Sequence, residues 1–201
     1  ANDMLSGKLQ GMNQNANVLN GTMANLGTAI AGAFSVYAIT GFVKSVVSAG
    51  TTVENATTGL TTLLGDASEA TRVVQNTMQD ATKTPFAFEG LLSANKALIG
   101  AGIGADRARA DVLNLANAIS ATGGGDDELG RMVVNLQQIS NTGKATAQDI
   151  KQFAFAGVNI YKVLSDATGK PISKIKEMGV SYDMLTMALA KAHEKGGIYY
   201  N

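Results

Sequence analysis

The sequence of 201 residues has no cysteine, no tryptophan, one histidine and two prolines. Without thiols it excludes a disulfide framework, an iron–sulfur cluster, a zinc finger and a cysteine nucleophile. A single imidazole leaves little for a histidine-based metal site. Sixteen Lys and Arg balance sixteen Asp and Glu, and a neutral chain argues against nucleic-acid binding, which requires a basic face. We therefore expect no metal, no cofactor and no sequence-specific nucleic-acid binding.

Charge is scarce and unevenly distributed. Charged residues make up 16% of the chain, below the roughly 25% usual for globular domains. No charged residue occurs between Lys8 and Lys44, whereas the rest of the chain is charged more normally. This change in composition predicts two regions, residues 1–48 and residues 49–201.

Apolar and small residues repeat through the first region with alternating spacings of four and three. This is a heptad pattern, which predicts a left-handed coiled-coil seam. A lone helix with so many glycines is marginal in water, so we expect it to depend on self-association or on packing against the second region. The seam positions are Leu5, Leu9, Met12, Ala16, Leu19, Met23, Leu26, Ile30, Ala33 and Tyr37.

The end of this segment, residues 29–47, is more apolar, and it includes Phe34, Ile39 and Phe42. Its uninterrupted apolar stretch is shorter than the 18 or more residues of a spanning helix. Two interpretations remain open: a buried or inter-subunit helix, or a segment that enters a membrane only after a conformational change. In the second interpretation these three side chains would contact the membrane or a partner.

The second region carries helical periodicity broken by glycine and proline, without alternating strands joined by hairpin turns. The fold class is therefore all-α: a compact multi-helix domain preceded by a long, low-charge helix with heptad character. Thr146 and Asp149 resemble a capping box, and Asp66 or Ser68, Asp106 and Ser181 are placed to begin helices. The expected helices span residues 46–64, 68–83, 91–99, 106–119, 126–139, 150–156, 160–167 and 182–192.

No pattern of catalytic residues stands out. Residues 100–105 fit G-x-G-x-x-A, but no strand is expected before them, so a helix–helix turn explains the glycines. Gly143-Lys144 and Gly169-Lys170 lack the other residues of a phosphate loop and are better explained as helix C-caps. The carboxylates at 126–128 favour a helix start, and His193 has no partner arrangement and is expected on the surface. The sequence indicates no enzyme.

Phe153 and Phe155 are two residues apart on an expected helix, so they point to different faces. One could lie in the core while the other contacts a partner, although burial of both between neighbouring helices is the favoured interpretation.

Six short stretches, in order, resemble the tape measure domain of tail tape measure proteins from tailed phages and prophages. They cover roughly residues 50–201, and the first fifty residues match only in type. The stretches are Thr84-Pro85-Phe86 with Leu91-Leu92 and Gly100; residues 119–125; Leu136-Gln137-Gln138-Ile139 with Gly143-Lys144; residues 148–153; residues 156–161; and Ala188-Leu189 with residues 196–201.

The resemblance implies a structural protein that lies in the lumen of the tail tube as the tube polymerises, whose length sets tail length and which leaves at DNA ejection. It implies assembly in the bacterial cytoplasm, residence in the virion tail, and contacts with tail-tube and tail-tip or baseplate-hub proteins. The heptad seam further predicts that the protein forms a homo-oligomer, for example a trimer. The alternatives are a membrane-active injection segment that meets the host membrane at ejection, and a generic helical adaptor domain.

Overall fold

A computed structural model describes residues 50–200, and it describes side chains from Asn55 onward. The chain divides into two compact units, Ala1–Val53 and Glu54–Asn201. The expected heptad helix and the seam positions from Leu5 to Tyr37 lie outside the described residues, as do Phe34, Ile39 and Phe42.

Residues 50–200 fold into α-helices and contain no strand, which confirms the all-α prediction for this part of the chain. The helices are α3 (Gly50–Leu64), α4 (Ala67–Ala81), α5 (Phe88–Gly100), α6 (Ala105–Ala121), α7 (Asp126–Thr142), α8 (Ala147–Phe155), α9 (Ile160–Thr168), α10 (Ile172–Met178) and α11 (Tyr182–His193).

Local side chains set where several helices begin. The carboxylate of Asp66 accepts hydrogen bonds from the amides of Ser68 and Glu69 at the start of α4. Thr146 Oγ1 accepts from the amide of Asp149, whose carboxylate accepts from the Thr146 amide at 2.6 Å. These bonds satisfy backbone donors that the first helical turn leaves unpaired. Both caps match the residues expected from the sequence.

Glycines set where other helices end. Gly143 after α7 and Gly169 after α9 adopt left-handed backbone angles, with φ of 84° and 68°. Each amide returns a hydrogen bond to the last turn of its helix, at Ile139 and Ser165. This is the C-cap geometry that glycine adopts without steric cost.

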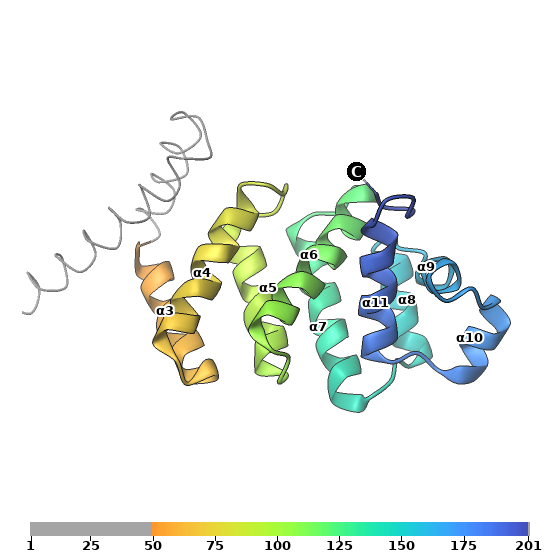
Figure 1. Ribbon diagram of the computed structural model, residues 1–201, viewed down its shortest axis with the longest axis horizontal. Helices are drawn as coiled ribbons and strands as arrows, with labels where there is room; N and C mark the ends of the chain where they lie inside the picture. The colour runs from red at the N-terminus through yellow and green to blue at the C-terminus, as the bar shows by residue number, and fades with distance from the viewer. Residues whose placement is uncertain (1–49, 201) are drawn as a thin grey trace, which may run out of the picture. The chain divides into compact units, whose positions relative to one another are not determined.

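The helices run from α3 at one end of the unit to α9 and α10 at the other, and α11 folds back beside α6 and α9 (Figure 1). The most extensive helix pairs are α9 with α11, α5 with α7, and α6 with α11. Burying a large aliphatic or aromatic side chain contributes about 1.5–3 kcal/mol. The largest fully buried side chains are Leu60, Leu91, Leu98, Leu115, Ile119, Leu129, Met132, Leu136, Ile139, Phe153, Leu164 and Ile175.

The structure contains one helix that the sequence interpretation missed, α10. Its apolar residues Ile172, Ile175 and Met178 are spaced by three, but the pattern covers only seven residues and only Ile175 is buried. It begins directly after Pro171, whose φ of −65° suits the start of a helix.

Candidate functional site

Phe155, the last residue of α8, is the most exposed large apolar side chain of the described residues, with 77% of its surface accessible. Phe153 is fully buried in the same helix. A separation of two residues turns the helix by about 200°, so the two rings face opposite sides. The expectation that both would be core is wrong for Phe155. Phe153, proposed as a contact residue, is unavailable to a partner because it packs in the core.

An open hollow of about 410 Å³ lies between α8 and the start of α9; Ala154, the residue before Phe155, lines it, and Phe155 does not. Most of its wall is apolar, and Lys151 and Asn159 add polar groups. Concave, mainly apolar sites with a few polar groups are where proteins usually bind their partners or ligands. The lining residues are Ile150, Lys151, Ala154, Gly157, Val158, Asn159, Ile160 and Tyr161.

The turn that forms the hollow is held against the end of α6. Thr122 Oγ1 donates to the carbonyl oxygen of Ala156 at 3.1 Å. Gly157 follows with a φ of 79°, and a Cβ there would lie 2.9 Å from Thr122 Cβ. A larger residue at 157 would therefore be both strained and crowded. The shape of the hollow depends on this close approach.

The hollow carries positive charge. Lys151 lines it, and Lys176 from α10 places its ammonium 5.1 Å from the centre of the Tyr161 ring. This distance is suited to a cation–π interaction. Neither lysine has a carboxylate partner among the described residues, whereas Lys162 and Lys174 are paired with Asp166 and Glu177.

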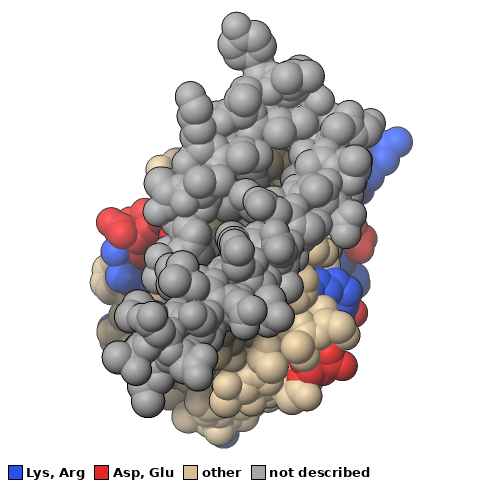
Figure 2. Space-filling view, turned by 90° about the vertical axis from the view of Figure 1, so that its left-hand side faces the viewer, with Lys and Arg blue, Asp and Glu red and all other residues tan. Residues whose placement is uncertain are grey.

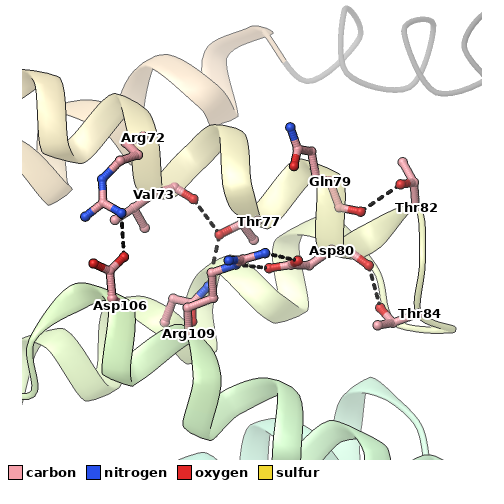
Figure 3. Close-up of polar contacts among 10 residues, drawn as sticks. Arg72, Val73, Thr77, Gln79, Asp80, Thr82, Thr84, Asp106 and Arg109 are labelled. Carbon is pink, nitrogen blue, oxygen red and sulfur yellow. Dashed lines mark hydrogen bonds and ion pairs between the residues drawn. The ribbon is translucent and has the colours of Figure 1, made fainter. Parts of the chain in front are cut away.

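A second polar cluster joins α4 to α6 (Figure 3). The buried carboxylate of Asp80 accepts two hydrogen bonds of 2.6 Å from Arg109. Arg72 binds Asp106 nearby, and this bond lowers the pKa of the Asp106 carboxyl. In this arrangement each charged side chain is paired with one of opposite sign on the other helix. Its role is to hold the two helices together.

A buried carboxyl lies between α6 and α11. Asp111 accepts a hydrogen bond of 2.7 Å from Tyr182 Oη, and Arg107 Nε lies 3.5 Å from it. Burial raises the pKa of Asp111, against the opposing effects of Tyr182 and Arg107. Burial and the bond to Asp111 also raise the pKa of the Tyr182 hydroxyl. Shifted pKa values can mark active sites, but this group is enclosed between helices and does not line the hollow.

The other sequence candidates also have structural explanations. The glycines of residues 100–105 form the turn between α5 and α6, and Asp126 accepts from the amide of Ala87 at the start of α5. His193, expected on the surface, is partly buried, and its Nε2 lies 3.2 Å from Asn117 Nδ2. The described part of the chain holds no group of three or more potential metal ligands.

Sequence reasoning missed the hollow and the pair of Tyr161 and Lys176. Their residues come from α8, α9 and α10, and no regular spacing connects them.

None of the helices described here has both the length and the hydropathy to cross a bilayer. The apolar segment at residues 29–47 lies outside the described residues.

Comparison with known proteins decides the family. A family model described as "Tape measure protein" matches residues 44–197, which is well over half of the chain. The chain belongs to the tape measure protein family. This confirms the resemblance found in the sequence, and it makes the chain part of a structural protein of phage tails with a tape measure role. No curated protein and no solved structure matches the chain.

Proposed function

We propose that Glu54–Asn201 is the anchoring module of a tail tape measure protein, and not the part that measures length. The observation that carries this proposal is the folding of short helices back on one another (Figure 1). About 150 residues in one continuous helix would span about 220 Å. Packed into a compact unit, the same residues have a radius of gyration of about 15 Å. A segment that sets tail length must be extended, so that each residue adds to the length, and this compact unit is not extended.

The module would attach the protein to the tail-tip or baseplate-hub proteins and to the tube, through Phe155 and through the hollow between α8 and α9. An exposed aromatic side chain, here on a helix that also lines an apolar hollow, is the kind of anchor that dominates protein interfaces. Its work would be mechanical and not enzymatic: it would act in the cytoplasm during assembly, then in the tube lumen, and leave at DNA ejection.

Residues 5–37 would bring several copies together along the tube axis. The heptad spacing, the absence of charge after Lys8 and the small side chains support close packing of parallel helices. Leu19→Asp with Leu26→Asp should abolish the homo-oligomer measured by sedimentation velocity. Gln14→Asp with Asn17→Asp adds the same charge off the seam and should leave it intact. An oligomer that survives the first pair would show that the seam is wrongly placed.

Tail length tests the anchoring role. In a phage whose tail uses this protein, deletion of residues 54–201 should prevent tail formation, seen by electron microscopy. Tails that still assemble but are shorter by about 220 Å, the length of the deleted segment as a helix, would show instead that the unit measures length.

A second candidate is membrane insertion by residues 29–47 during ejection, favoured by the apolar run there, in which Lys44 is the one charged residue. A peptide of residues 25–50 should then release dye from liposomes. Intact liposomes at micromolar peptide would contradict this candidate.

A further inference from the structure

After α11 the chain turns back across the end of that helix. The Tyr199 amide donates to the carbonyl oxygen of Ala192 at 2.8 Å, and the Gly197 amide donates to that of Glu194 at 2.7 Å. A Cβ on Gly197 would lie 2.3 Å from the Ala192 oxygen, so the close approach requires glycine. We refer to residues 194–200 as the closing turn.

Tyr199 is the buried residue of the closing turn. It is 7% exposed, whereas its neighbours Ile198 and Tyr200 are 46% and 54% exposed. Burial raises the pKa of the Tyr199 hydroxyl, and a hydrogen bond from the backbone of Asn159 opposes that rise. Tyr199 therefore reaches the start of α9, which is remote from it in the sequence.

Asn159 connects this contact to the hollow. It lines the hollow, and its side chain caps α9 by accepting a hydrogen bond of 3.2 Å from the amide of Lys162. Two residues earlier, Gly157 approaches Thr122 at the end of α6. The short segment between α8 and α9 that forms the hollow is therefore held at two points, by Thr122 and by Tyr199.

Among the described residues, charge marks no comparable contact at the α3 end of the unit. Acidic and basic side chains lie near one another there, at both edges of the view (Figure 2). In α4, Arg72 is paired with both Glu69 and Asp106. Exposed pairs of this kind contribute little to stability. The closing turn differs because a buried aromatic ring holds it in place.

We infer that the closing turn is a latch: with Tyr199 inserted it keeps the hollow in shape, and withdrawal of Tyr199 loosens the segment between α8 and α9. Displacement of the closing turn would then release a partner from the hollow. Coupling of this kind requires an element with two arrangements, here the turn with its tyrosine inserted or withdrawn. Because the hollow is taken as a contact with tail proteins, the inference rests on the proposed function and adds a means of regulating it.

A buried thiol can measure opening of the hollow, since the chain itself has no cysteine. Val158 lines the hollow and is 0% exposed, so a cysteine in its place reacts with the aromatic disulfide DTNB only when the segment opens. In the full chain carrying Val158→Cys, Tyr199→Ala should raise the labelling rate by about tenfold or more. Tyr199→Phe keeps the ring and loses the hydroxyl, so it should raise the rate by about threefold.

Matched controls separate a local latch from a general loss of stability. Tyr200→Ala removes the exposed neighbouring tyrosine and should leave the rate within about twofold. Val133→Cys places the thiol at a buried valine of α7, which is 1% exposed, and Tyr199→Ala should not change its labelling. Gly197→Ala disturbs the close approach to Ala192 without altering Tyr199, and it should accelerate labelling in the hollow as Tyr199→Ala does. Circular dichroism confirms that each variant folds.

Either of two results overturns the inference. If the Tyr199 variants leave labelling in the hollow unchanged, the closing turn does not hold it. If they accelerate the thiol in α7 equally, Tyr199 contributes only to overall stability. Should Val158→Cys fail to fold, amide hydrogen exchange in the cysteine-free chain decides: Tyr199→Phe should lower protection in residues 157–161 and not in α7, and unchanged protection in 157–161 rejects the latch.

The labelling experiment involves no tail, so it fails or succeeds independently of the proposed function. A negative labelling result leaves the anchoring role intact. Tails that still assemble after deletion of residues 54–201 would refute the anchoring role and leave the latch intact.

Discussion

At the scale of single residues, the polar groups between helices contribute unequally to stability, and burial decides by how much. Asp80 is 5% exposed and receives two hydrogen bonds from Arg109. Asp80→Ala would leave the guanidinium, itself only about one-third exposed, without its hydrogen-bonded carboxylate partner. We expect a loss of about 2–3 kcal/mol in the free energy of unfolding, measured with urea.

Lys162 and Asp166 provide the matched comparison, because both side chains are 52% exposed. Water and salt screen this pair, so Asp166→Ala should cost less than about 0.5 kcal/mol. If Asp80→Ala and Asp166→Ala lowered the free energy of unfolding equally, the assignment of Asp80 as the residue that joins α4 to α6 would be contradicted.

Asp111 should make stability depend on pH in the direction opposite to that of an exposed, paired carboxylate. Its pKa is raised above the ordinary value of 3.8, mainly by burial. As pH rises above about 4, the unfolded chain ionises this group before the folded chain does, and the stabilisation present at lower pH is lost. The variant Asp111→Asn has no ionisable group at this position, so it does not lose this stabilisation as the pH rises.

The measurement is the free energy of unfolding of both chains between about pH 3.5 and 7. The wild-type value minus that of Asp111→Asn should fall as the pH rises. Tyr182→Phe should make the fall larger, since the Tyr182 hydroxyl lowers the pKa of Asp111. A difference that rises with pH would show that the ion pair with Arg107 outweighs burial.

At the scale of elements, α8 presents two phenylalanines with opposite roles. Phe153→Ala removes a fully buried ring and should cost about 3–5 kcal/mol. Phe155→Ala removes a ring that is 77% exposed, and its effect on unfolding should stay within about 0.5 kcal/mol. Urea titration measures both. A large loss for Phe155 would mean that its ring packs within the unit and does not serve as a contact.

Element boundaries were predictable where one residue decides them. Asp66 and Thr146 cap helices through their own side chains, and Gly143 and Gly169 end helices through backbone angles that glycine favours. Such signals act over a few residues, so they can be read from the sequence. α10 has one buried residue and no side-chain cap, and it forms only against its neighbours.

The candidate site was less predictable because it depends on contacts between distant residues. The two phenylalanines were known to face opposite ways, but which ring is buried depends on what packs against α8. The hollow requires the contact between Gly157 and Thr122, and its charge requires Lys176 to reach Tyr161 from another helix. Nothing in local spacing encodes either contact.

At the scale of the whole molecule, Glu54–Asn201 should fold without the first forty residues. It is a compact unit of about 150 residues, a size that buries about 68–70% of the surface of the unfolded chain. Deleting residues 1–40 should leave a single cooperative urea transition, with a free energy of unfolding within about 0.5 kcal/mol of that of the full chain.

The matched control is a shorter deletion at the other end, residues 182–201. It removes α11, which packs against α6, α7 and α9 and contributes the buried Leu185 and Leu189. This twenty-residue loss should abolish the cooperative transition, although it is half the size of the first. If the first deletion also broadened or abolished the transition, the stability of the unit would depend on residues 1–40, and an independent anchoring module would be ruled out.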